Sequence, residues 1–303
     1  MPNRAKEGYL SLRRKIRGAG AGAGAGAVNG SGDGAGAGEG TAQPELTPVQ
    51  KDLALTFDVF ALPKLFTPID TTITPSELFP SGVIVVNGIN EVAERQFYRF
   101  VYRLDPQAIL IYTAGRIATR QSSGMSWTRG GCGHVYHGEV EASNHGDRRF
   151  ENADRPHERR VLTMQLEEMG ADGKGHKVTI GRAALRAALA VLQIREWTAN
   201  GIKRLVIATD SEYVVKHATQ SLGKWAPRNF QTGQDHDMIE DGDLWKKFWA
   251  ECQFWYEQGL EIFFWHILEE QNSLARSKAV IGAQMPAVEE FGGPKSLAIQ
   301  KDL

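Results

Sequence analysis

Asp210 is well placed to do chemistry, because it directly follows the apolar run Leu205–Thr209. That run has the composition of a buried strand, so the carboxylate stands at a strand end. Carboxylate oxygens are the ligands that hard cations such as Mg²⁺ prefer. One carboxylate alone does not make a metal site, so other acids must decide what Asp210 can do. The acids that we weigh as partners are Glu139, Glu141, Glu167, Glu168 and Glu212.

A second candidate is a basic and aromatic segment over residues 216–230. It combines cations that pair with phosphates and rings on which bases can stack. Five acids follow between residues 235 and 243 and weaken the positive field. Nucleic-acid binding by this segment therefore stays open beside the alternative of an ordinary solvated surface. The candidate residues are Lys216, Lys224, Trp225, Arg228, Asn229 and Phe230.

Other kinds of site find little support. Cys132 and Cys252 are far apart and form no CxxC pair, which argues against a disulfide framework and a cysteine zinc site and favours a reducing compartment. The Gly-rich stretch 18–40 is not a phosphate loop, because no Lys-Ser or Lys-Thr follows it. His266 ends an apolar run, and we expect a partly buried packing residue rather than a catalytic one.

Composition predicts a folded protein inside the cell. The 303 residues are 42% hydrophobic, enough to fill a sizeable core. The 35 Lys and Arg residues balance 36 Asp and Glu residues, which excludes a histone-like basic protein, so any nucleic-acid contact must be local. No apolar run approaches the roughly 18 residues of a membrane span, so we expect no membrane partner. Nucleus, cytoplasm and mitochondrion all stay open.

Composition also divides the chain into four parts. Residues 1–47 are basic and then Gly/Ala-rich, which predicts a disordered leader. Residues 48–107 contain several prolines and predict an irregular extension packed on the following domain, with a helix-like stretch over 93–104. The folded domain covers 108–283, and 284–303 forms a C-terminal tail.

The apolar periodicity within 108–283 predicts an α/β domain. Three strands come first, then helices alternate with two further strands, so we expect a mixed five-stranded sheet with flanking helices. The predicted strands are Ala108–Thr113, Gly131–Val140, Arg160–Glu168, Leu205–Thr209 and Leu260–Ile267. The predicted helices run from Ile180 to about Ala199, from about Glu212, from about Asp243 to Gln258 and from about Asn272 to Gly282.

Five ordered sequence blocks resemble the ribonuclease H (type 1) family, especially the RNase H-like domains of fungal proteins. IYTAGR resembles the YTDG start of that family, GRAALRAALAVL its NRAELRA helix, and RLVIATDSEYVV its fourth-strand motif. KWAPRNF with DLW resembles the segment on the substrate side, and FWHILEEQNSLARSKA resembles the NxxAD ending. The resemblance implies an RNase H-like fold over about 108–283.

The same resemblance implies a damaged metal site. The family hydrolyses the RNA strand of RNA:DNA hybrids with two Mg²⁺ ions held by four acids. Carried over by motif, those acids correspond to Ala114, Ala184, Asp210 and Arg276, so only Asp210 is retained. We expect Mg²⁺ binding to be lost and no cofactor. Either Arg276 pairs with Asp210 in place of the metal, or it points to solvent.

These expectations leave two classes of function. The first is an inactive relative of the hybrid ribonucleases that retains binding of an RNA:DNA hybrid, another nucleic acid or a protein. The second is an active metal-dependent hybrid ribonuclease with a rearranged carboxylate site. The resemblance also implies that the segment 216–230 meets the DNA backbone of a hybrid.

Overall fold

The computed structural model describes residues 61–86, 95–122, 125–138, 160–194, 197–232 and 237–292. They belong to one compact unit, Leu46–Leu303. The predicted leader over 1–47 lies outside the described residues, as do Glu139 and Glu141. Among the residues that are described, no helix combines the length and the hydrophobicity that crossing a bilayer requires.

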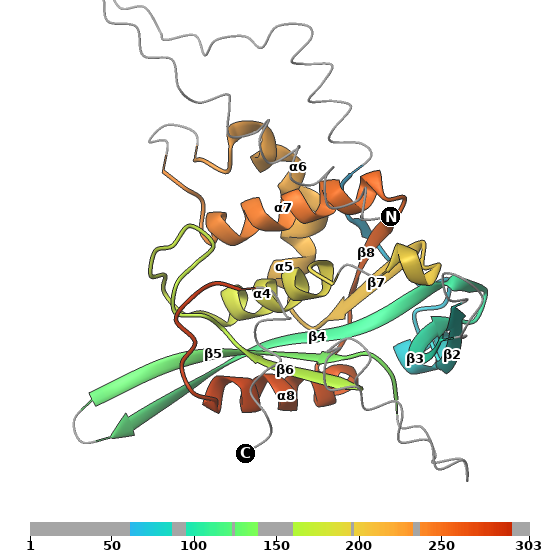
Figure 1. Ribbon diagram of the computed structural model, residues 1–303, viewed down its shortest axis with the longest axis horizontal. Helices are drawn as coiled ribbons and strands as arrows, with labels where there is room; N and C mark the ends of the chain where they lie inside the picture. The colour runs from blue at the N-terminus through green and yellow to red at the C-terminus, as the bar shows by residue number, and fades with distance from the viewer. Residues whose placement is uncertain are drawn as a thin grey trace, which may run out of the picture. The chain divides into compact units, whose positions relative to one another are not determined.

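The predicted mixed sheet is confirmed (Figure 1). The long strand β4 pairs in parallel with β7, which pairs in parallel with β8. On its other side β4 pairs antiparallel with β5, and β5 with β6. The strands are β4 (Asp105–Ser122), β5 (Met125–Val135), β6 (Val161–Gln165), β7 (Arg204–Thr209) and β8 (Glu261–His266).

The N-terminal extension also contributes strands, which sequence reasoning did not foresee. A two-residue strand β1 (Lys64–Leu65) adds in parallel to β8. The hairpin of β2 (Ser81–Val86) and β3 (Arg95–Tyr102) joins the first half of β4. The helix expected over 93–104 is therefore wrong. Phe97 and Arg99, two positions apart, are both buried, and this period of two fits a strand rather than a helix.

Helices cover the sheet. The helix predicted to reach Ala199 ends at Leu192, and a short 3-10 turn closes on Gly201, whose φ of 77° is a left-handed conformation that glycine adopts without strain. The helices are α3 (Pro75–Leu78), α4 (Ile180–Leu192), α5 (Glu212–Lys216), α6 (Leu222–Trp225), α7 (Gly242–Glu257) and α8 (Ser273–Gln284). Single turns lie at Thr198–Asn200, His217–Ser221, Ala226–Arg228 and Glu270–Asn272.

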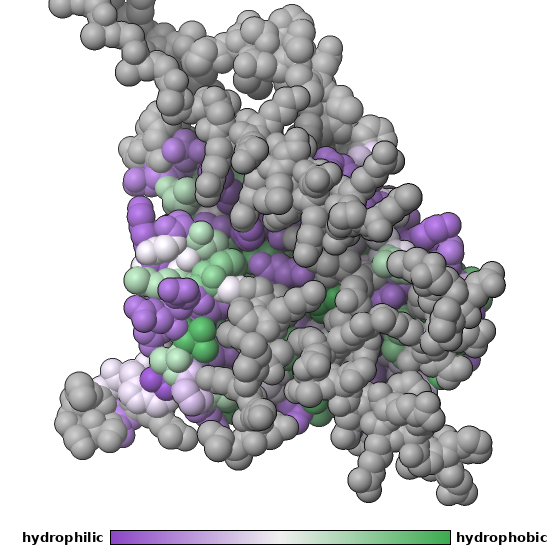
Figure 2. All heavy atoms as spheres, in the orientation of Figure 1, coloured by the Kyte–Doolittle hydropathy of each residue, from purple (hydrophilic) through white to green (hydrophobic). Residues whose placement is uncertain are grey.

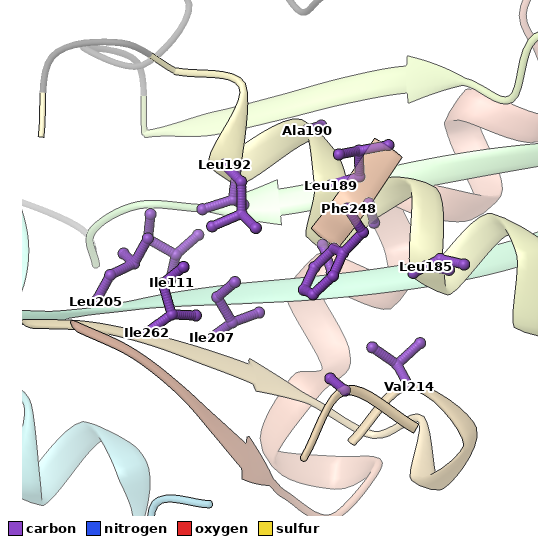
Figure 3. Close-up of a cluster of buried hydrophobic side chains, with 14 of the residues drawn as sticks. Ile111, Leu185, Leu189, Ala190, Leu192, Leu205, Ile207, Val214, Phe248 and Ile262 are labelled. Atoms are coloured by element: carbon purple, nitrogen blue, oxygen red, sulfur yellow. The ribbon is translucent and has the colours of Figure 1, made fainter. Parts of the chain in front are cut away.

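Two apolar cores lie on opposite faces of the sheet. Odd-numbered residues of β4 and β7, such as Ile111 and Ile207, pack against α4 and α7, where Leu189 and Phe248 join them (Figure 3). Even-numbered residues such as Leu110 pack with the alanines of α8. Because successive side chains of a strand point to opposite faces, one strand serves both cores.

Helix α8 packs directly against the backbone of β5, and glycines make this contact possible. A Cβ atom built on Gly131 would lie 2.1 Å from the backbone nitrogen of Ala283. One built on Gly133 would lie 2.1 Å from the carbonyl oxygen of Ala275. This close approach brings the N-terminal end of α8 to the edge of the sheet where β7 ends, next to Asp210.

Candidate functional site

Asp210 lies at the carboxyl end of β7, between the two strands with which β7 pairs. Ser211 then caps α5, because its hydroxyl accepts a hydrogen bond from the backbone of Val214 at 3.4 Å. The local sequence therefore turns from strand to helix at this point. Asp210 is held at the turn, and its side chain keeps only 4% of its surface exposed.

Three side chains contact the Asp210 carboxylate. Arg116 donates a hydrogen bond from Nη2 to Oδ2 over 2.5 Å, and Asn272 donates from Nδ2 to Oδ1 over 2.7 Å. Arg276 places its Nε 3.7 Å from Oδ2, which is an ion pair but longer than a hydrogen bond. Both carboxylate oxygens are thus engaged by the protein's own donors.

Asn272 joins three parts of the site. It precedes α8, is almost fully buried, and its Nδ2 also donates to the carbonyl oxygen of Thr113 at 2.9 Å. Thr113 is the last residue of β4 that pairs with β7, opposite Thr209. Asn272 therefore fastens the start of α8 to the ends of both central strands and orients Asp210.

Arg116 is the functional residue that sequence reasoning missed. It lies in β4 two residues beyond Ala114, so the strand alternation places both residues on the same face. Its side chain is 18% exposed, against 29% for Arg276. Arg276 makes its hydrogen bond to Glu269 instead. The pairing of Arg276 with Asp210 is present, but Arg116 is the nearer cation.

The two alanines at positions where the family motifs imply acids pack in different layers. Ala114 follows Thr113 in β4, and its methyl group packs with Ala275 and Ala279 of α8. Ala184 packs in the opposite core, and its backbone nitrogen lies only 2.0 Å from a Cβ built on Gly115. Both methyl groups are buried in apolar clusters.

The residues present do not fit the two Mg²⁺ ions of the resembled family. Mg²⁺ requires oxygen ligands in near-octahedral geometry, and two ions require several carboxylates. Asp210 is here accompanied by two guanidinium groups, which stay protonated and repel a divalent cation. Glu269 nearby is engaged by Arg276.

Acids elsewhere in the described residues do not replace the missing ones. Glu167 is buried against Arg186, and Glu212 is exposed. The one group of three potential metal ligands among the described residues is Asp172, His176 and Asp243, which does not include Asp210. Asp243 in that group is already paired with Arg182 at 2.7 Å.

The segment 216–230 divides into exposed cations and packed rings. Lys216, Lys224 and Arg228 are exposed, as is Asn229, whose side-chain oxygen accepts from Lys246. Phe230 is only 2% exposed, so it cannot offer a ring to a base. Trp225 is half-buried, with its ring centroid 4.8 Å from that of His217 and 5.7 Å from that of Trp245. The cations of this candidate surface are thus exposed, whereas Phe230 is buried and cannot belong to it.

The exposure of His266 also differs from what the sequence predicted. It is the last residue of β8 and pairs in register with Thr209, yet its side chain is exposed rather than partly buried. The neighbouring Trp265 and Ile267 are buried instead. The strand alternation places His266 on the same face as the buried Phe264, so its exposure goes with its position at the end of the strand.

A model of the RNase H family matches residues 107–258. The chain belongs to the RNase H family. No curated protein matches it. Among solved structures, it resembles a foamy viral protease-reverse transcriptase in complex with RNA/DNA hybrid at 19% identity and a TM-score of 0.37, over 57% of this chain and 20% of that one. The match thus spans about a fifth of the viral chain.

Two separate RNase H structures are covered more fully. The solution structure of the PFV RNase H domain matches at 20% identity and a TM-score of 0.35, over 58% of this chain and 93% of the other. RNase H1 from Halobacterium salinarum matches at 15% identity and a TM-score of 0.31, over 58% and 98%.

The contacts of Asp210 predict unequal couplings to its two arginines. In double-mutant cycles with Asp210→Ala, the coupling to Arg116→Ala should reach about 1–3 kcal/mol, because each single change leaves one buried partner of a hydrogen-bonded pair without its counter-charge. The coupling to Arg276→Ala should stay within about 0.5 kcal/mol, since that pair is longer and more exposed. Urea unfolding measures both. Equal couplings would show that the ranking by distance is wrong.

Proposed function

We propose that this RNase H-family protein binds RNA:DNA hybrids without cleaving them. The observation that carries the proposal is the state of Asp210, whose oxygens are occupied by Arg116 and Asn272. Three of the four acid positions implied by the family motifs hold alanine or arginine. Hybrid cleavage by two metals needs ligands that the described site does not supply.

Family membership supports a hybrid as the ligand. Binding a duplex requires cations at the phosphates rather than metal ions, and the exposed Lys216, Lys224 and Arg228 fit that need. The domain over 108–283 has 22 Lys and Arg residues and 22 Asp and Glu residues, so the contacts must be local. We therefore expect modest affinity that falls steeply with salt.

The competing function is an active ribonuclease with a rearranged carboxylate site. Its remaining support is Glu139 and Glu141, which lie outside the described residues. A third reading, in which the domain binds only a protein partner, predicts no affinity for nucleic acid. Cleavage and binding measured side by side separate all three.

The test uses a labelled RNA:DNA hybrid with the full chain. With Mg²⁺ or Mn²⁺ we expect no cleavage above a buffer control. Binding of the same hybrid should survive EDTA, because no divalent ion takes part in it. Robust cleavage that Asp210→Asn abolishes would establish the rearranged enzyme instead. Absence of both cleavage and binding would favour the protein-binding reading.

A further inference from the structure

The outer part of the β4–β5 hairpin forms an arm, residues 117–122 and 125–129. Here β4 and β5 pair only with each other, because β7 pairs with β4 at residues 108–113 and β6 pairs with β5 at residues 131–135. Figure 1 shows the arm extending beyond the ends of α4 and α8. The arm therefore presents both strand edges and both faces outside the packed core.

The arm belongs to a stretch of unusual charge. Residues 107–138 contain three arginines, Arg116, Arg120 and Arg129, and no Asp or Glu. The domain over 108–283 as a whole is balanced, so its remainder is slightly acidic, and acids follow the basic segment 216–230 closely. Arg120 and Arg129 therefore lie in a stretch of sequence that carries no carboxylate, whereas Arg116 pairs with Asp210. In Figure 2 the outer arm is mostly pale to purple, so its visible surface is largely polar.

The strand register gathers these positions on one face. Arg116, residue 118 and Arg120 are alternate positions of β4, and they pair with Gly131, Arg129 and Trp127 of β5 in turn. Directly opposed residues of antiparallel strands share a face. This face is the one that α8 covers further in, where Gly131 touches Ala283. We call Arg116, Arg120 and Arg129 on this face the basic row. It begins next to the C-terminal end of α8.

In the described residues, the guanidinium group of Arg129 contacts only uncharged groups. Its Nη1 donates to the carbonyl oxygen of Met285 at 3.3 Å, and its guanidinium lies 4.4 Å from the centre of the Trp127 ring. Neither contact neutralises its charge, because a carbonyl and an aromatic ring are uncharged. Arg116 at the base of the row reaches Asp210. The row thus leads from the arm to the former metal site.

We propose that this face of the arm, with Arg120 and Arg129, binds the phosphate backbone of a nucleic-acid duplex and guides it toward Asp210. The inference rests on the proposed function, because it names the surface for the hybrid. Guanidinium groups bind phosphate oxygens through two parallel hydrogen bonds, and such contacts position a duplex without reading its sequence. The complementary charge selects a polyanion over an apolar partner.

The test measures hybrid binding by the full chain as a function of salt. The Arg120→Gln/Arg129→Gln variant removes two cations from the arm. We expect its affinity to fall about tenfold or more at low salt, and the slope of log K against log salt to shrink by about 1.4–1.8. The matched control, Lys174→Gln/Lys203→Gln, removes two exposed cations that belong neither to the arm nor to the segment 216–230, and it should change the slope less.

The outcomes separate this inference from the proposed function. If the natural chain binds no hybrid, the proposed function fails and the arm surface with it. If it binds and only the control variant weakens binding, the arm inference is wrong while the function stands. If the double glutamine variant lowers the Tm, the single Arg120→Gln variant is tested instead, because it leaves Arg129 in place. We expect its slope of log K against log salt to shrink by about half as much as in the double variant. An unchanged slope there also refutes the arm.

Discussion

A chain in which the acids are restored and Arg116 is removed should cleave RNA:DNA hybrid in the presence of Mg²⁺, whereas the natural chain should not. Four replacements are needed together, because two metal ions require several carboxylates and Arg116 otherwise keeps its guanidinium on Asp210. They are Ala114→Asp, Ala184→Glu, Arg276→Asp and Arg116→Ser.

The same four positions supply a matched control. A chain with Ala114→Asn, Ala184→Gln, Arg276→Asn and Arg116→Ser has similar side-chain volumes without the new charges. We expect cleavage by the carboxylate chain to exceed cleavage by the amide chain at least about tenfold, which corresponds to 1.4 kcal/mol of transition-state stabilisation. Initial rates with Mg²⁺ and with EDTA give the comparison.

Incomplete restorations should stay inactive. In particular, the triple variant that keeps Arg116 should match the buffer control, because a permanently charged guanidinium remains 2.5 Å from Oδ2 of Asp210. Cleavage by that triple variant would show that Arg116 does not block the metal. Burying new carboxylates at Ala114 and Ala184 lowers stability, so folding of every variant is checked by thermal unfolding.

Replacing Arg186 with alanine should have the largest effect on stability, about 3–5 kcal/mol. Arg186 and Glu167 are both buried and share hydrogen bonds of 2.7–3.1 Å. Arg186 also donates to the carbonyl of Gly292 at 2.6 Å and lies 4.8 Å from the Phe291 ring. Its removal leaves a buried carboxylate unpaired and frees the end of the described chain. Urea unfolding measures the loss.

The control replaces both charges by apolar side chains. Arg186→Met with Glu167→Leu removes the pair without leaving a charge behind, so it should cost clearly less than the single Arg186→Ala change. This comparison tests whether the cost comes from the stranded carboxylate. If the double replacement is as damaging as Arg186→Ala, then packing against Phe291 and Gly292, rather than charge, accounts for the stability.

Sequence periodicity predicted the central fold because its signals are local. The run Leu205–Thr209 is apolar throughout, as a parallel strand buried on both faces must be, and it is β7. The helix over Gly242–Glu257 follows from its aromatic residues at helical spacing. The helix expected over 93–104 failed because Phe97 and Phe100 are buried by strand pairing, a contact with distant residues that periodicity over a short window does not report.

The sequence by itself determined that alanine or arginine stands at three of the positions where the family motifs imply acids, since that depends only on residue types within recognisable motifs. Only the tertiary structure decided what replaced them. Arg116 reaches Asp210 across 94 positions of the chain, and it does so because β4 and β7 pair in register up to Thr113 and Thr209. Asn272 meets both strands from a third direction. The partners of a buried charge are set by packing between distant segments, so no local pattern names them.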